Sequence, residues 1–110
     1  MAPRRAAYLA LLPALLSTAA VVAQTRSAPI PEDSVRGYIR HAKGITVTVD
    51  GKPMRLAAGA IIRDRRNLII VPASIPREGA WANYILDRSG HIFRVWLLTP
   101  EELARPGGGG

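Results

Sequence analysis

The sequence predicts a mostly β protein, with a single small curled antiparallel sheet or barrel of five to six strands and a short C-terminal helix. Three observations lead to this fold class. Apolar and polar residues alternate on both sides of an Asp-Gly turn, and two further turns that begin with Asp separate apolar segments. The chain has no cysteine, so its fold must rest on an apolar core and not on disulfides.

Residues 1–23 have the organisation of a signal peptide. The basic segment "MAPRR" precedes an apolar stretch, and Val21 and Ala23 stand at the −3 and −1 positions of a cleavage site. The strongly apolar part is shorter than the roughly 20 residues that a membrane span needs. We expect cleavage near Ala23 and a periplasmic or secreted protein, the alternatives being a cut after Ala20 or an uncleaved anchor. No cysteine follows to carry a lipid.

The rest of the chain divides into three parts. Residues 24–36 contain prolines and few apolar side chains, which predicts a flexible lead-in. Residues 37–105 form the predicted β-rich domain. Residues 106–110, "PGGGG", predict a disordered glycine tail.

The segment "ITVTVDGKPMRL" predicts the first hairpin. Asp50 and Gly51 suit a two-residue type I′ turn, because glycine takes positive φ freely and aspartate tolerates it. The resulting register pairs Val49 with Lys52, Val47 with Met54, and Ile45 with Leu56. It places the apolar side chains on one face of the hairpin and Thr46, Thr48 and Arg55 on the other.

Two later turns have a common pattern, "DRRN" at residues 64–67 and "DRSG" at residues 87–90. In each, an aspartate begins a type I turn and an Asn or Gly at the end can take the left-handed conformation. They join "AIIRD" to "LIIVP" and "WANYILD" to "HIFRVWL". The segment "PASIPREGA" between the hairpins predicts a crossing loop. "TPEE" is a capping box, which predicts a short helix from Thr99 to about Arg105.

The last hairpin is apolar on both faces. The register expected from "DRSG" pairs Ile85 with Phe93, Trp81 with Leu97 and Asn83 with Val95 on one face. On the other it pairs Leu86 with Ile92, Tyr84 with Arg94, Ala82 with Trp96 and Ala80 with Leu98. A solvent-exposed sheet carries one polar face, so the second face needs a cover. The cover is the protein's own N-terminal segment and C-terminal helix, a second copy, or a partner.

Four residues of this hairpin are the candidate binding site: Trp81, Tyr84, Arg94 and Trp96. An exposed indole can anchor a partner, and an aromatic ring beside Arg94 can stack on its guanidinium. The alternative interpretation is that both indoles belong to the core.

The residues that metal ions and catalysis require are sparse. Only His41 and His91 are histidines, so the sequence predicts no metal site. No serine has a base and an orienting group beside it, and the carboxylates are explained by turns and by the helix start. No glycine-rich phosphate loop follows a strand. We therefore expect no catalytic residues, no cofactor and no enzymatic activity.

The chain is basic. Loss of Arg4 and Arg5 with the leader lowers the formal net charge from +7 to +5. The cations are dispersed, and only Arg63, Arg65 and Arg66 lie close together. They form either a solvated surface or an anion-binding face. Export argues against a nucleic-acid ligand.

Two functions follow as hypotheses. The first is an envelope module that binds a protein partner or itself, as a homodimer, through the apolar-aromatic face. The second is a basic surface that binds an anionic envelope polymer or lipid headgroups.

The segments "NLIIVPASIP" and "YILDRSGHIFRVWLLTPEE" resemble small exported bacterial proteins that have no assigned activity. The likeness covers about residues 44–105, and "RVWLLTPEE" is its most specific part. It implies export from a bacterial cell and no particular site residue. "VDGKPMRL" followed by "NLIIVPAS" is also similar in rhythm to the copper-amine-oxidase-like N-terminal domain, a non-catalytic β module. This chain lacks the Gly-Arg expected before "VP".

Overall fold

The structure, a computed structural model, describes residues 26–106. The predicted signal peptide and residues 107–110 of the predicted tail lie outside the described residues. The elements are β1 (Val35–Lys43), β2 (Thr46–Val49), β3 (Lys52–Arg63), β4 (Ile69–Ile70), the 3₁₀ turn η2 (Pro72–Ser74), β5 (Ala80–Leu86), β6 (Ile92–Leu97) and α1 (Pro100–Ala104). No helix in this part of the chain is long and apolar enough to cross a membrane.

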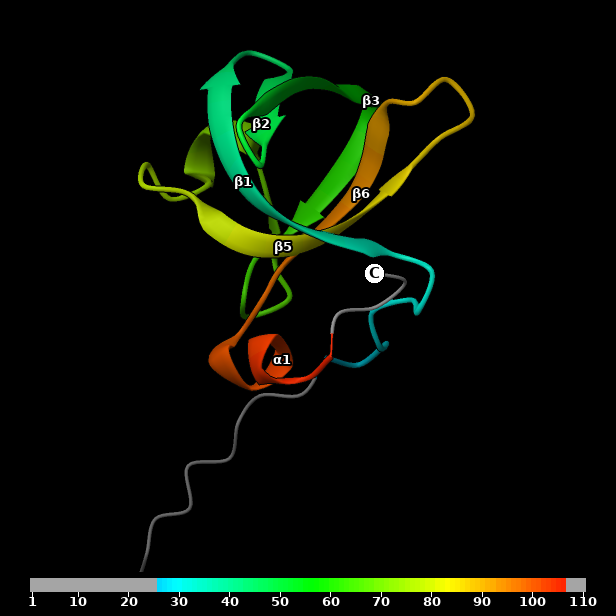
Figure 1. Cartoon of the computed structure of the whole chain (residues 1–110), viewed down its shortest axis with the longest axis vertical. Coiled ribbons are helices and arrows are strands. Elements are labelled where there is room, and N and C mark those ends of the chain that lie inside the picture. Colours follow the sequence, from blue (N-terminus) through cyan, green and yellow to red (C-terminus); the bar gives the residue numbers. More distant parts are fainter. Residues whose placement is uncertain (1–25, 107–110) are drawn as a thin grey trace, which may run out of the picture.

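The strands form one closed barrel (Figure 1). They lie in the order β2-β1-β5-β6-β3-β4, and an additional pairing of β2 with β3 closes the ring. Five strands make the barrel, β4 adds an edge to β3, and α1 lies below. The predicted small barrel with a short C-terminal helix is confirmed.

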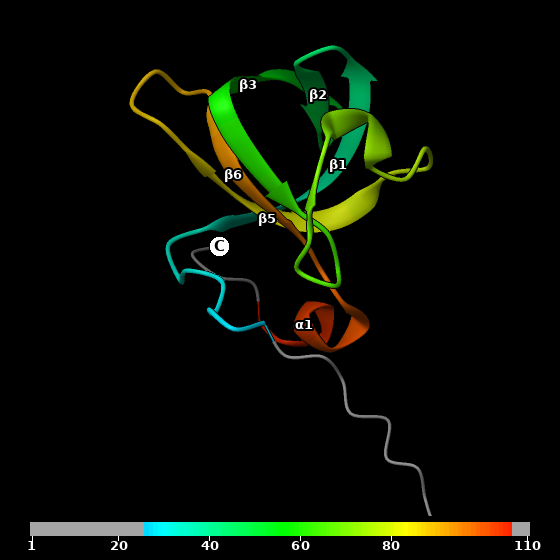
Figure 2. The same cartoon turned by 180° about the vertical axis from the view of Figure 1, so that it is seen from behind.

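The barrel is mixed and not purely antiparallel, because β6 runs parallel to β3. The physical reason is the connection between them. After β4 the chain crosses one end of the barrel through η2 and enters β5 beside β1 (Figure 2). The hairpin from β5 then brings β6 back along β3 in the same direction.

The three predicted turns are confirmed. Asp50 and Gly51 have φ of 53° and 84°, and Val47 pairs with Met54 as expected. Asn67 and Gly90 have φ of 66° and 83° at the ends of the other two turns. In each of these two turns the aspartate Oδ1 accepts backbone N–H groups two and four residues later. One detail of the first hairpin differs: Ile45 precedes β2, and its side chain is exposed.

The predicted register between β5 and β6 is wrong beyond its first pair. Leu86 pairs with Ile92 as expected, but Ile85 then pairs with Arg94, which leaves Phe93 as an extra residue in a β-bulge. From there every pair shifts by one residue: Tyr84 with Val95, Asn83 with Trp96, and Ala82 with Leu97. Trp81 and Trp96 therefore lie on the same face of the sheet, and not on opposite faces.

The sequence pattern does not predict β1. Its inward positions are Val35, Gly37 and Ile39, which pair with Tyr84, Ala82 and Ala80 of β5. The outward positions between them are Arg36 and Tyr38. Inward and outward residues do alternate along β1, but Gly37 and the neighbouring arginines hide the apolar–polar pattern in the sequence.

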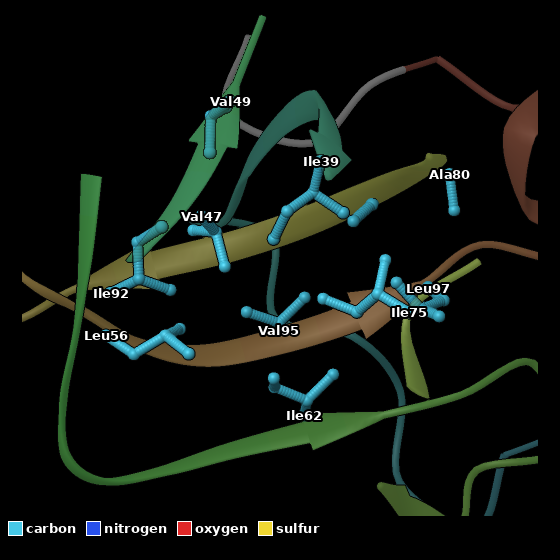
Figure 3. Packing of buried hydrophobic residues seen from close by; sticks show 11 residues of the cluster. Ile39, Val47, Val49, Leu56, Ile62, Ile75, Ala80, Ile92, Val95 and Leu97 are labelled. Atoms are coloured by element: carbon cyan, nitrogen blue, oxygen red, sulfur yellow. The ribbon is translucent and has the colours of Figure 1, made fainter. Parts of the chain in front are cut away.

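The core fills the barrel interior (Figure 3). Its buried members are Ile39, Val47, Val49, Leu56, Ile62, Ile75, Ala80, Ala82, Ile92, Val95 and Leu97. Ile75 comes from the crossing segment after η2. The predicted loop between the second and third hairpins therefore contributes to the core.

Both ends of the described chain pack against the barrel. Residues 26–34 have no regular secondary structure, but Arg26 and Ser34 are buried. This part of the predicted flexible lead-in therefore differs from expectation, since its polar side chains find partners in the barrel and helix. The predicted capping box is present: Thr99 Oγ1 accepts the Glu102 N–H at 3.1 Å, and Glu102 accepts the Thr99 N–H at 3.0 Å.

Candidate binding face

The outward residues of β1, β5, β6 and the end of β3 lie on one side of the sheet, which we call the Trp face. Pairing across the strands arranges it in rows. One row runs through Arg36, Asn83, Trp96 and Arg63. The neighbouring rows are Tyr38 with Trp81, and Ile85 with Arg94 and Ile61.

Trp81 is the exposed aromatic residue of the Trp face, at 42% relative accessibility. Its ring makes an edge-to-face contact with Tyr38, with centroids 5.4 Å apart and planes at 77°. Tyr38 is held in turn by its hydroxyl, which donates to the Glu78 carbonyl at 2.8 Å. Edge-to-face pairs of this kind are favourable beyond their buried area. The Trp81 indole thus has a supported position while much of it stays in contact with water.

Trp96 is half-buried in the middle of the Trp face. Its cross-strand neighbours are Asn83 on β5 and Arg63 on β3. Asn83 is buried and donates through Nδ2 to Ser34 Oγ at 2.8 Å. Trp96 is therefore neither fully buried in the core nor fully exposed. One of its neighbours, Asn83, is hydrogen-bonded to the lead-in residue Ser34, and the other, Arg63, is a cation.

Arg94 lies beside the bulge. Its guanidinium sits 4.8 Å from the centroid of the Phe93 ring, and Nη1 donates to the Phe93 carbonyl at 2.8 Å. The predicted stacking of Tyr84 with Arg94 does not occur, because the bulge replaces Tyr84 with Phe93 as the aromatic neighbour.

Tyr84 does not belong to the Trp face. It pairs with Val35 and Val95 on the inward side and packs against the core. Burial, and then the nearby negative charge of Asp50, raise the pKa of the Tyr84 hydroxyl above its ordinary value. The structure thus brings three of the four predicted site residues onto one face and places the fourth on the inward side of the sheet, against the core.

The protein's own ends cover one margin of the Trp face. Residues 29–32 and the C-terminal segment enclose a cleft of about 600 Å³, whose floor includes Asn83 and Leu98. Arg36 spans it and donates to the carbonyls of Glu102, Leu103 and Arg105 at the end of α1. These segments cover Asn83 and Leu98, which are both buried. Among residues 26–106, none covers the margin that carries Trp81, whose side chain stays exposed.

The charge of the Trp face is one-sided. Its outward strand positions carry Arg36, Arg40, Arg63 and Arg94 and no carboxylate. The nearest acidic residues in sequence lie in the turns and at the start of α1. The arrangement can bind an anionic group next to an apolar one, since guanidinium forms paired hydrogen bonds with carboxylates.

The described residues contain no group of three or more His, Cys, Asp or Glu side chains placed to hold a metal ion. His41 Nε2 lies 3.0 Å from the Gly44 carbonyl within its own turn. The His91 backbone N–H donates to Asp87 Oδ1 at 2.9 Å, within its own turn.

Comparisons of the chain with protein-family models, curated proteins and solved structures found no match. The candidate site therefore rests on the chain's own residues. The resemblance to small exported bacterial proteins stays a prediction.

Two features of the surface were not predicted from the sequence. Arg26 was assigned to the lead-in, and nothing in its local sequence indicates its distant partners. Leu68 was assigned to the second hairpin without any indication that it would be exposed. The opposite orientation of Ile69 and Ile70 could be predicted, because neighbouring strand residues point to opposite faces.

Proposed function

We propose that this chain is an exported, non-catalytic binding module whose Trp face docks a partner protein. The observation that carries the proposal is the exposed Trp81 on a face whose outward strand positions include four arginines and no carboxylate. Aromatic and arginine side chains are enriched among the residues that contribute most to protein interfaces. The signal-peptide pattern of residues 1–23 supports export.

The charge of the face supports a different protein as the partner and not a second copy. A two-fold dimer through the Trp face would bring arginines of one copy against arginines of the other. Like charges at an interface oppose association. The fitting partner presents carboxylates around an apolar centre that receives the Trp81 indole.

Site-specific photo-crosslinking in the producing cell tests the proposal. A photoreactive phenylalanine analogue at position 81 is expected to give one dominant adduct with another protein. The same analogue at Ile45, an exposed position outside the Trp face, is the matched control. Arg94→Glu, combined with the analogue at position 81, is expected to reduce the adduct severalfold by reversing the local charge.

Equal crosslinking from positions 81 and 45 would reject the proposal. An adduct whose mass corresponds to two copies of this chain would reject a different protein as the partner and support self-association.

A further inference from the structure

The most exposed large hydrophobic side chains of the described chain lie together around β4. Leu68, Ile69 and Val71 have relative accessibilities of 53%, 61% and 62%. Arg65 and Arg66, in the turn directly before them, are also exposed. We call these five residues the aliphatic patch.

The structure holds the aliphatic patch in an outward position. Ile70, between Ile69 and Val71, packs against the core and pairs with Ile62 of β3. On one side the Leu68 carbonyl accepts the Asp64 N–H at 2.8 Å, and on the other the Val71 carbonyl accepts the Ser74 N–H at 2.9 Å. The inward anchor of Ile70 therefore forces its two neighbours toward solvent.

The patch is basic as well as apolar. Arg65 and Arg66 of the patch, and Arg63 beside it, surround a single acidic residue, Asp64. Asp64 Oδ1 accepts the backbone N–H groups of Arg66 and Leu68. Arg63 Nη1 donates to the Asn67 carbonyl at 2.9 Å, and Arg65 Nε donates to the Leu98 carbonyl at 2.8 Å. These bonds orient two guanidinium groups without bringing them an opposite charge.

Neither a second copy of the chain nor an added β-strand fits the aliphatic patch. A second copy would set the two arginines of the patch against the same two arginines. A partner strand that extends the sheet needs a longer edge than β4 offers, since β4 has only two residues. Short edge strands are a common protection against such pairing.

An anionic bilayer surface fits both properties of the patch. Aliphatic side chains can enter the boundary between headgroups and acyl chains, while neighbouring guanidinium groups bind lipid phosphates. Basic residues near an anionic leaflet add electrostatic attraction. We infer that the aliphatic patch is a peripheral contact with a membrane that contains anionic phospholipid. This inference does not depend on the proposed partner protein, because it uses neither Trp81 nor Trp96.

Vesicle co-sedimentation tests the inference. Residues 24–110 are used, because they contain every residue of the described barrel and exclude the apolar leader, which would itself bind vesicles. We expect binding to vesicles of phosphatidylcholine mixed with phosphatidylglycerol and much weaker binding to phosphatidylcholine alone. Binding should decrease as salt rises, since the electrostatic part is screened.

Two matched pairs of variants locate the contact. Ile69→Ser is expected to reduce partitioning about fivefold or more, whereas Ile45→Ser, at an exposed isoleucine of another hairpin, should not. Arg66→Gln is expected to reduce it about fivefold, whereas Arg88→Gln, in the related turn at residues 87–90, should not. Circular dichroism confirms that each variant keeps the fold.

Three results would overturn the inference. The first is no binding to the mixed vesicles, and the second is equal loss in a patch variant and its matched control. The third is a dimer of the lipid-free chain, measured by light scattering, that Ile69→Ser converts to monomer, because a second copy would then occupy the patch.

Discussion

Arg26 and Glu102, 76 positions apart in the sequence, form a two-point ion pair: Nε to Oε2 at 2.7 Å and Nη2 to Oε1 at 3.0 Å. Arg26 also donates to the carbonyls of Asp64 and Leu97 and to Asn67 Oδ1. The side chains of Arg26 and Glu102 are only 4% and 17% exposed. One guanidinium thus joins the N-terminal segment to the second hairpin, the end of β6 and the start of α1.

Removing the charge of Glu102 should destabilise the fold. Glu102→Gln leaves the Arg26 guanidinium buried without its counter-charge, and breaking one partner of a buried pair costs about 3 kcal/mol. Urea denaturation measures the change in free energy of unfolding. Glu101→Gln, at the exposed neighbouring position in α1, is the control and should change it by less than about 0.5 kcal/mol. Similar losses in the two variants would show that the ion pair contributes little.

The same pair predicts a loss of stability in acid. Burial alone would raise the pKa of Glu102, but hydrogen bonds from Arg26 and Thr99, together with the charge of Arg26, outweigh it and lower the pKa. Because the folded pKa is the lower one, the stabilisation is fully present above the unfolded value of about 4.3. It is lost as pH falls through the folded pKa.

Denaturation of the wild type and Glu102→Gln across a pH series measures this effect. The difference between the two free energies of unfolding should be constant near neutral pH and should shrink below about pH 4.3. A difference that stays constant down to the lowest pH would contradict the assignment to Glu102.

Gly37 should not tolerate a side chain. A Cβ built there lies 2.7 Å from Val49 Cγ1 and 3.3 Å from Tyr84 Cε1, so Gly37→Ala overpacks the barrel interior. Overpacking costs about 1–3 kcal/mol, measurable as a lower free energy of unfolding. Val49→Ala removes the closest atom, so the double variant should lose less stability than the two single variants together. If the two losses of stability were additive, the destabilisation by Gly37→Ala would not come from its contact with Val49.

The local features of this fold could be predicted from the sequence. Three turns and one helix cap depend only on the residues that form them, so the local sequence is enough to predict them: the turns at residues 50–51, 64–67 and 87–90, and the capping box at Thr99. The bulge at Phe93 depends on how β6 fits between β5 and β3. That information is not local, and the predicted register failed there.

In the candidate site, too, the residue types could be predicted from the sequence, but their arrangement in space could not. Arg94, Trp96 and Trp81 were identified by residue type, but their common face follows from the bulge. Tyr84 lies inward because it alternates along β5 with the core residues Ala80 and Ala82. The partners of Arg26 come together only when the barrel, the second hairpin and α1 are all in place. Sequence patterns of period two carry no signal for such contacts.

The proposed export predicts where the mature chain begins relative to Arg26, the residue that forms the ion pair with Glu102. Cleavage after Ala23 leaves only Gln24 and Thr25 before Arg26, so we expect the mature chain to begin two residues before Arg26. Mass spectrometry of the protein from the envelope fraction should find Gln24 at the N-terminus. Ala23→Arg should impair this cleavage, because the −1 position requires a small residue, whereas Ala28→Arg, beyond the site, should not. A chain that keeps Met1 in the membrane fraction would show an uncleaved anchor, and a full-length chain in the cytosol would show that residues 1–23 do not direct export.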